Sequence, residues 1–282
     1  MERKHYPSDL TDAQWEVLHD MLPDAKPGGR PRKTDLRELV NALFYIAREG
    51  CSWRALPHDF GIPWKTVYNY FQDWKEDGTW TRLVDALRFR VRQAAGRDPE
   101  PIAGYIDSQS VKTAQGGEQR GYDTAKNVHG RKRHIVVDSL GLLLVVVVTA
   151  ADVDDARAAQ TVFAAMPGRD YPRLQRVWAD NKYHNYDLYN WLSLHRRPYQ
   201  LLVVNRPPGK KGWVKLPKRW VVERTFAWLG YYRRLSKDYE HTVASSEAMI
   251  QISGIHHMLR RLKRTKTKYR FRFKRPRRKR VA

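Results

Sequence analysis

The hydrophobic pattern of this chain of 282 residues changes its period about one third of the way along. In the first part, apolar residues recur every three or four positions, as in Leu36, Leu39 and Leu43, which is the spacing of one helix face. Further on they gather in short runs such as Leu142–Thr149 and Leu174–Trp178, which are typical of strands. We therefore predict an all-α unit followed by an α/β unit.

The all-α unit is expected over residues 1–96. Thr11 and Gln14 have the spacing of a capping box, Gly50 ends the next helix, and Pro63 begins another helix after the turn at Gly61. Two helices around a glycine turn are typical of a helix-turn-helix domain. The polar face of the second helix could contact DNA through Lys65, Thr66, Asn69 and Gln72. A plain helical bundle with a solvated polar face explains the pattern equally well.

The α/β unit is expected over residues 97–260, with three strands in succession and two more that alternate with helices. The predicted strands are Ala103–Ile106, His134–Val137, Leu142–Thr149, Leu174–Trp178 and Gln200–Val204. The predicted helices are Asp154–Met166, Asn185–Leu194 and Arg219–Leu229. This order predicts a mixed five-stranded sheet with flanking helices, as in the RNase H-like fold.

Two acids follow apolar strands of this unit. Asp107 comes after the first strand and Asp180 after the fourth, so strands lying side by side would bring both carboxylates to one sheet edge. Such a pair repels unless a cation lies between the two groups. Glu223, on the last predicted helix, could supply a third oxygen ligand for Mg²⁺ or Mn²⁺. Taken singly, each aspartate could be a turn former, and Glu223 could pair with Arg219 or Arg224.

The charge of the chain predicts a polyanionic partner. Lys and Arg number 53 against 30 Asp and Glu, a formal net charge of +23. The excess is greatest in the expected tail of residues 261–282, where Tyr269, Phe271 and Phe273 lie among the basic residues. That composition suits phosphate contact with base stacking, although a solvated flexible tail is the simpler interpretation.

Other side chains are weaker candidates. Lys112, Arg131, Lys132 and Arg133 flank the first strands and could hold phosphates, or could be ordinary surface charges. Trp213 could stack on a displaced base or be a buried anchor.

Composition also indicates the compartment. The longest apolar run, Leu142–Val148, is too short to span a bilayer, and no secretory leader is apparent. Cys51 is the only cysteine, so no internal disulfide can form. We expect a soluble protein of the bacterial cytoplasm, associated with the nucleoid when it is bound to DNA.

Several segments in order resemble the DDE transposases of bacterial insertion sequences, in particular insertion-sequence family five and its sister family four. The resembling segments are Gly28–Lys33, Trp53–Phe60, Ile106–Lys112, Gly130–Asp138, Trp178–Asp180 and Arg219–Gly230. The resemblance implies that Asp107, Asp180 and Glu223 hold two Mg²⁺ or Mn²⁺ ions. It also implies an enzyme, acting as a homodimer in a synaptic complex, that cleaves at terminal inverted repeats and joins the 3′-hydroxyl ends to target DNA.

The chain departs from the sister family around the glutamate. That family has a Tyr, Arg, Glu, Lys pattern there, and Arg219 occupies the Arg place. Leu216 and Gly230 stand where Tyr and Lys would be. The phosphate-binding role of the missing residues would then fall to Arg233 or Arg234.

Two other functions are compatible with the fold. One is a DNA-binding repressor that descends from such an enzyme and does not cut DNA, and the other is a different RNase H-like nuclease such as a resolvase. The presence of three acids that could bind metal ions argues against the repressor, because a protein that only binds DNA does not need them. The expected helix-turn-helix and the resemblance argue against the resolvase.

Deletion of residues 260–282 should weaken DNA binding at every sequence and reduce its salt dependence. Each lost phosphate contact removes about one counterion's contribution to the slope of log K against log salt concentration. Binding isotherms at several salt concentrations measure that slope. An unchanged slope would show that the tail makes no contact in the complex.

Overall fold

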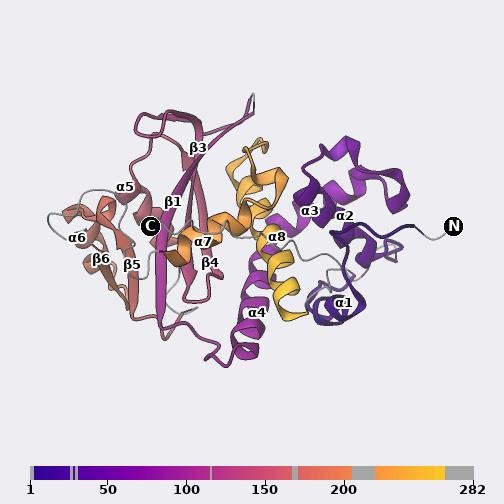
Figure 1. Cartoon of the computed structure of the whole chain (residues 1–282), viewed down its shortest axis with the longest axis horizontal. Helices are drawn as coiled ribbons and strands as arrows, with labels where there is room; N and C mark the ends of the chain where they lie inside the picture. The colour runs from indigo at the N-terminus through magenta and orange to yellow at the C-terminus, as the bar shows by residue number, and fades with distance from the viewer. Residues whose placement is uncertain are drawn as a thin grey trace, which may run out of the picture.

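The computed structural model describes residues 3–25, 28, 31–114, 116–166, 171–204 and 220–263. Its first part is helical, as predicted, and the α/β part follows (Figure 1). The α-helices are α1 (Asp12–Leu18), α2 (Leu36–Glu49), α3 (Trp64–Glu76), α4 (Thr79–Ala94), α5 (Asp155–Ala164), α6 (Tyr186–Leu194), α7 (Trp220–Leu229) and α8 (Val243–Leu262). The strands are β1 (Ala103–Lys112), β2 (Gly121–Asp123), β3 (Val128–Asp138), β4 (Leu143–Ala150), β5 (Arg176–Asp180) and β6 (Gln200–Val204).

The helix boundaries follow the predicted local chemistry. Thr11 and Gln14 form a reciprocal capping box at the start of α1. Gly50 ends α2 in the left-handed region, with a φ of 77°, and Gly61 turns the chain in the same way before α3. A side chain at position 50 would also collide with Arg233, because a Cβ there would lie 2.9 Å from the Cβ of Arg233. Glycine therefore allows both the turn and the close approach at position 50.

The sheet has the predicted mixed order of five principal strands. β1 pairs antiparallel with β3, and β3 pairs antiparallel with β4, whereas β1, β5 and β6 run parallel to one another. The RNase H-like strand order is thus confirmed. A sixth strand, β2, pairs with the start of β3 and was not predicted, because three residues are too few to show a periodicity.

β1 and β3 are longer than the sequence predicted. β1 continues through Asp107 to Lys112, and β3 begins at Val128, six residues before its predicted start. The added part of β3 contains Arg131, Lys132 and Arg133, all of which are buried. Charged side chains in a strand interior conceal it from any prediction that relies on apolar residues.

Helices cover both faces of the sheet. α5 and α6 pack on one face in an apolar cluster that includes Ile106 and Val177. α7 and α8 pack on the opposite face, in a cluster that includes Tyr105 and Val137. That second cluster continues without interruption into the N-terminal helices, since α8 contacts β4 as well as α1, α2, α3 and α4 (Figure 1). The all-α and α/β parts therefore share one core.

The end of α8 corrects the predicted start of the tail. The helix continues to Leu262, and Arg261 donates a hydrogen bond to the carbonyl of Leu140 at 3.0 Å. Arg260 and Arg261 are thus helical, and a truncation meant to spare α8 should begin at residue 264. Residues 264–282, which include most of the expected tail, lie outside the described residues. Within the described ranges, every helix is too short or too polar to cross a membrane.

A half-buried carboxyl group joins α8 to β4. The backbone N–H of Val148 donates to Glu247 of α8 at 2.8 Å. Burial raises the pKa of Glu247 to about 7 from its ordinary value of 4.5, although the bond from Val148 acts in the opposite direction. The folded protein therefore favours the protonated carboxyl group.

Replacement of Glu247 by Gln should reduce the pH dependence of stability. Because the folded pKa of Glu247 is raised, its contribution to stability is complete below pH 4.5 and is lost as the pH rises through about 7. The amide of Gln can still accept the Val148 bond and does not ionise. Between about pH 5 and about pH 8, wild type should lose on the order of 1–3 kcal/mol relative to Glu247→Gln in urea unfolding. Parallel pH profiles would contradict this assignment.

Candidate catalytic site

The two candidate aspartates lie level with each other on neighbouring parallel strands. β1 and β5 pair through Ala103–Arg176, Gly104–Val177 and Tyr105–Trp178, and no further pair follows. The same offset places Asp107 level with Asp180. Asp107 is therefore inside β1 and not at its end as predicted, but it lies just beyond the point where β5 stops pairing. Asp180 is the last residue of β5, which ends two residues beyond the predicted end at Trp178.

Both aspartates face the side of the sheet on which α7 lies. Side chains alternate between the two faces of a strand, so Asp107 shares a face with Tyr105, and Asp180 with Trp178. Tyr105 and Trp178 belong to the cluster under α7, whereas Ile106 and Ala179 belong to the cluster under α5 and α6. The two carboxylates thus belong to one face and one level of the sheet.

Local hydrogen bonds orient both carboxylates. The backbone N–H of Ser108 donates to Oδ1 of Asp107 at 2.8 Å. The backbone N–H of Lys182 donates to Oδ1 of Asp180 at 2.9 Å, and Asp180 thereby begins the 3₁₀ turn Asn181–Tyr183. Both aspartates are half-buried. Half-buried carboxylate oxygens at one level are suitable donors for a hard divalent cation, so these residues fit such an ion.

Glu223 lies in the first turn of α7 and is exposed. Val221, Val222 and Thr225 hold the helix on the sheet, where α7 contacts β1 and β3. Glu223 therefore belongs to the same side of the sheet as the two aspartates. Within the described ranges, however, no three His, Cys, Asp or Glu side chains are arranged so that they could hold a metal ion. The structure brings the aspartates level but does not gather all three acids into a metal-binding cluster.

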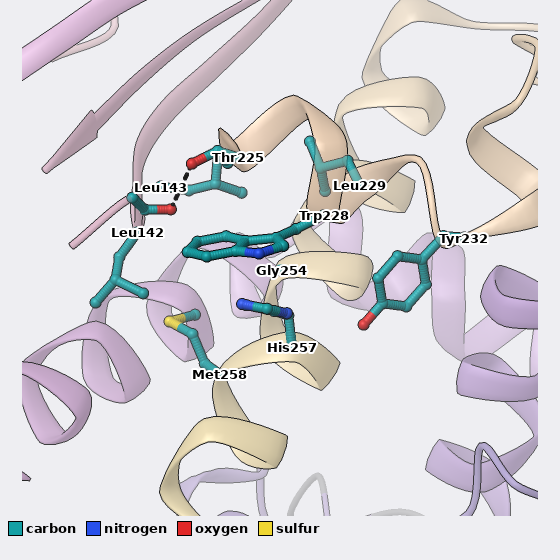
Figure 2. A pocket seen from close by; sticks show the side chains of 10 residues that line it. Leu142, Leu143, Thr225, Trp228, Leu229, Tyr232, Gly254, His257 and Met258 are labelled. Carbon is teal, nitrogen blue, oxygen red and sulfur yellow. Dashed lines mark hydrogen bonds between the residues drawn. The ribbon is translucent and has the colours of Figure 1, made fainter. Parts of the chain in front are cut away.

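α7 is anchored to α8 beside a small apolar cavity of about 20 Å³ (Figure 2). Trp228 of α7 stacks on His257 of α8 with 4.5 Å between ring centroids, and Arg261 lies over the same indole. The hydroxyl of Thr225 donates to the carbonyl of Gly141 at 2.9 Å. Burial lowers the pKa of His257 to about 4, so the ring is neutral at pH 7. The cavity is a gap in the packing of α7, and its lining includes neither Glu223 nor the aspartates.

A fourth acid, which sequence analysis missed, lies in the same region. Asp155 begins α5 and is buried. The buried side chain of Tyr183 lies near Asp155 and near both candidate aspartates. Burial raises the pKa of Tyr183 well above its ordinary value, and the negative charges of Asp107, Asp155 and Asp180 raise it further. The available signal was the pair Asp154–Asp155 before an apolar helix, which is normally explained by helix capping. Asp154 does cap α5.

Asp155 is hydrogen-bonded and ion-paired. It accepts a hydrogen bond from the Ser108 hydroxyl at 2.7 Å and lies 3.3 Å from Nζ of Lys132 and 3.7 Å from Nζ of Lys182. Burial would raise the pKa of Asp155, but the Ser108 bond and the Lys132 charge outweigh it and lower that pKa. Asp155 is therefore ionised at pH 7.

The basic residues of β3 are structural. Arg131 is fully buried and donates to the carbonyls of Glu118, Glu240 and His241, with Asp238 at 3.4 Å. The expected phosphate contacts of Arg131, Lys132 and Arg133 are therefore not available in this structure, because all three side chains bind groups of the protein. Arg133 donates to the carbonyls of Leu235 and Lys237, and Lys132 to that of Val153.

The arginines near α7 are mostly engaged as well. Arg234 is buried and binds Glu240 at 2.7 Å and the carbonyl of Cys51 at 2.9 Å, so it does not present its guanidinium to solvent. Arg224 lies over the rings of Trp220 and Trp228. Only Arg233 of these three is exposed, and it pairs with Glu49 at 3.1 Å.

The remaining candidates differ in exposure. Lys65 and Asn69 are exposed on α3, Thr66 and Gln72 are half-buried, and Lys112 is exposed at the end of β1. Gln72 accepts a hydrogen bond from Lys75. Arg219, Trp213 and Leu216 lie outside the described residues.

Comparisons with known proteins indicate a common family. A family model described as a transposase DDE domain matches residues 98–273, and a model for transposases of the IS4/5 family matches residues 10–84. A protein of Burkholderia cepacia, named as a transposase for insertion sequence element IS402, is 30% identical, and the match covers 60% of this chain and 83% of that protein. The uncharacterized protein y4sN of Sinorhizobium fredii is 33% identical over 38% of this chain and 78% of its own length.

A chain in the crystal structure of the Mos1 strand transfer complex also matches. The match covers 85% of this chain and 79% of that chain, with 12% identity and a TM-score of 0.30. A score this low does not indicate a shared fold.

Replacement of Arg131 by Met should reduce stability and leave the salt dependence of DNA binding unchanged. Loss of the guanidinium leaves the buried Asp238 and three carbonyls without this partner, at a cost of about 3–5 kcal/mol. Lys112→Met, on the neighbouring strand, is the matched exposed control and should change stability by less than about 0.5 kcal/mol. Urea unfolding and binding isotherms measure the two effects. A stable Arg131→Met protein with a smaller salt slope would show that Arg131 does contact DNA.

Proposed function

This chain belongs to the transposases that carry a DDE domain, and we propose that it cleaves DNA at the ends of an insertion sequence and joins the freed 3′-hydroxyl ends to target DNA. The observation that carries the proposal is the placement of Asp107 and Asp180 at one level of neighbouring parallel strands. Glu223, on the helix that lies on the same face, supplies the third carboxylate.

Each acid has a distinct part in this proposal. Asp107 and Asp180 provide oxygen ligands from rigid strands, and their orientation is maintained by the N–H groups of Ser108 and Lys182. A pair of Mg²⁺ or Mn²⁺ ions, when bound, would supply an activated oxygen nucleophile and stabilise the leaving oxygen of the phosphodiester. Glu223 is exposed on α7, so it can complete the ligand set on the side from which DNA approaches.

The electrostatic character of the chain supports DNA as the substrate. The formal net charge of +23 favours association with a polyanion over a long range. In the helical part, Lys65 and Asn69 are exposed on α3, where they can contact the terminal inverted repeats. Among the described cations that were expected near the acids, Lys112 and Arg233 are exposed. We propose that two copies act together in a synaptic complex, because two transposon ends must be joined.

Replacement of Asp180 by Asn should abolish cleavage and leave binding of transposon ends nearly unchanged. Asn keeps the size and the hydrogen-bonding oxygen of Asp but removes the charge that a divalent cation requires. The rate of nicking should fall by several orders of magnitude, because the ions assist both the nucleophile and the leaving group. The measurement is incubation of purified protein with labelled DNA carrying the element's ends, in Mg²⁺ or Mn²⁺, beside a binding assay.

The control is Asp187→Asn, which removes an exposed carboxylate from the first turn of α6. This variant should cleave and bind as wild type does. If Asp180→Asn still nicked end DNA at nearly the wild-type rate in Mg²⁺, Asp180 would not be a metal ligand. A wild-type protein that bound the ends tightly and never cut them would instead support a repressor.

A further inference from the structure

Ser108 joins two acids that lie on opposite faces of β1. Its backbone N–H donates to Oδ1 of Asp107 at 2.8 Å, and its hydroxyl donates to Oδ1 of Asp155 at 2.7 Å. Because side chains alternate along a strand, the Ser108 hydroxyl points to the α5 face whereas Asp107 points to the α7 face. One residue is thus hydrogen-bonded on both faces of the sheet.

The separation of the strands makes the backbone bond possible. β5 stops pairing with β1 at Tyr105, so from there on β1 has no β5 partner on that edge. The N–H of Ser108 donates to the carboxylate of Asp107. The position of this N–H, and hence the orientation of the Asp107 carboxylate, depends on how firmly β1 is held at Ser108.

Asp155 is well placed to hold β1 at Ser108. It lies in the first turn of α5, is 5% exposed, and is paired with Lys132 of β3 at 3.3 Å. Nζ of Lys132 also donates to the carbonyl of Val153 at 2.7 Å, which fixes the ammonium between β3 and the segment that precedes α5. The acceptor of the Ser108 hydroxyl is therefore an ionised group attached to two elements of the core.

We propose that Asp155 and Ser108 are positioning residues for Asp107, which hold its carboxylate in the orientation that a divalent cation requires. This inference rests on the proposed function of Asp107. Neither side chain contacts the reacting atoms, because the Ser108 hydroxyl and Asp155 both lie on the face of the sheet opposite to Asp107. Their effect reaches the cation through the oxygen of Asp107.

The chain contains a matched control for this proposal. Ser110 lies two residues further along β1 on the same face, and its hydroxyl donates to Asp123 at 2.5 Å. The Ser110–Asp123 and Ser108–Asp155 pairs thus have the same chemistry on one strand. Loss of either hydroxyl should therefore have a similar effect on the structure. Only loss of the Ser108 hydroxyl should weaken cation binding, because only Ser108 adjoins Asp107.

The experiment compares Ser108→Ala, Ser108→Thr and Ser110→Ala in the full chain. Mn²⁺ binding is measured without DNA from the electron paramagnetic resonance signal of the free ion, and end cleavage is measured as a function of Mn²⁺ concentration. Ser108→Ala should weaken Mn²⁺ binding, and raise the concentration for half-maximal cleavage, by about tenfold. Ser108→Thr retains a hydroxyl and should restore most of both values. Ser110→Ala should stay within about twofold of wild type, which is below the usual effect of losing a metal-orienting partner.

A double-mutant cycle tests whether the two residues act through one bond. Asp155→Ala removes both the acceptor of the Ser108 hydroxyl and the carboxylate paired with Lys132, and it should weaken Mn²⁺ binding in the same direction. The double variant with Ser108→Ala should then bind Mn²⁺ no more weakly than Asp155→Ala alone, because the bond between the two side chains is already absent. Fully additive effects would show that the residues act independently and would overturn the proposal.

The outcomes separate this proposal from the proposed function. Asp107→Asn is included as a reference and should lose both Mn²⁺ binding and cleavage. If it lost both while Ser108→Ala equalled Ser110→Ala, the catalytic assignment would stand and the positioning role would be wrong. If Asp107→Asn bound Mn²⁺ and cleaved as wild type does, the metal site itself would be wrong.

Discussion

The candidate site depends on the separation of two parallel strands that are paired only at their start. β1 and β5 are hydrogen-bonded through Tyr105 and Trp178 and then part. Pairing holds Asp107 and Asp180 level, and separation leaves room for carboxylates where a continuous ladder would place apolar contacts. Side chains that repel each other can be kept close here because the backbone below them is already fixed by the ladder. Ile106 and Ala179, which directly precede the two aspartates, face the opposite side of the sheet and anchor the strands under α5 and α6.

Buried arginines link this sheet to the helical part. Arg131 and Arg133 bind carbonyls of the segment between α7 and α8, and Arg234 of that segment binds the carbonyl of Cys51 just after α2. Arg48 of α2 in turn donates to the carbonyl of Tyr231 at 2.9 Å. The segment after α7 is thus held by the sheet and by α2 together, so a displacement of α2 would be transmitted to the helix that carries Glu223.

Sequence analysis predicted the features that follow from apolar periodicity and local chemistry. The order of helices and strands, the caps at Thr11 and Gly50, and the neighbouring positions of the two strands that carry Asp107 and Asp180 all have this origin. It could not predict that Arg131 is buried, because a run of basic residues resembles a surface and two of its partners, Glu240 and His241, are more than 100 residues away. The contacts of Asp155 were also concealed, since Ser108 and Lys132 lie on β1 and β3, far from Asp155 in the sequence. The prediction that all three acids hold metal ions stays a prediction.

The position of α8 has a consequence for the order in which the protein is made. α8 packs against all four N-terminal helices, and its Ile252 and Ile255 belong to the same cluster as Leu39 and Leu87. The ribosome adds roughly 150 residues between α4 and α8, which takes on the order of 10 s at about 5–20 residues per second. Throughout that interval the first four helices lack the partner that covers their apolar faces. The helical part therefore acquires its complete core only after the sheet has been synthesised, so a nascent chain that stops before α8 leaves the apolar faces of its first four helices partly uncovered.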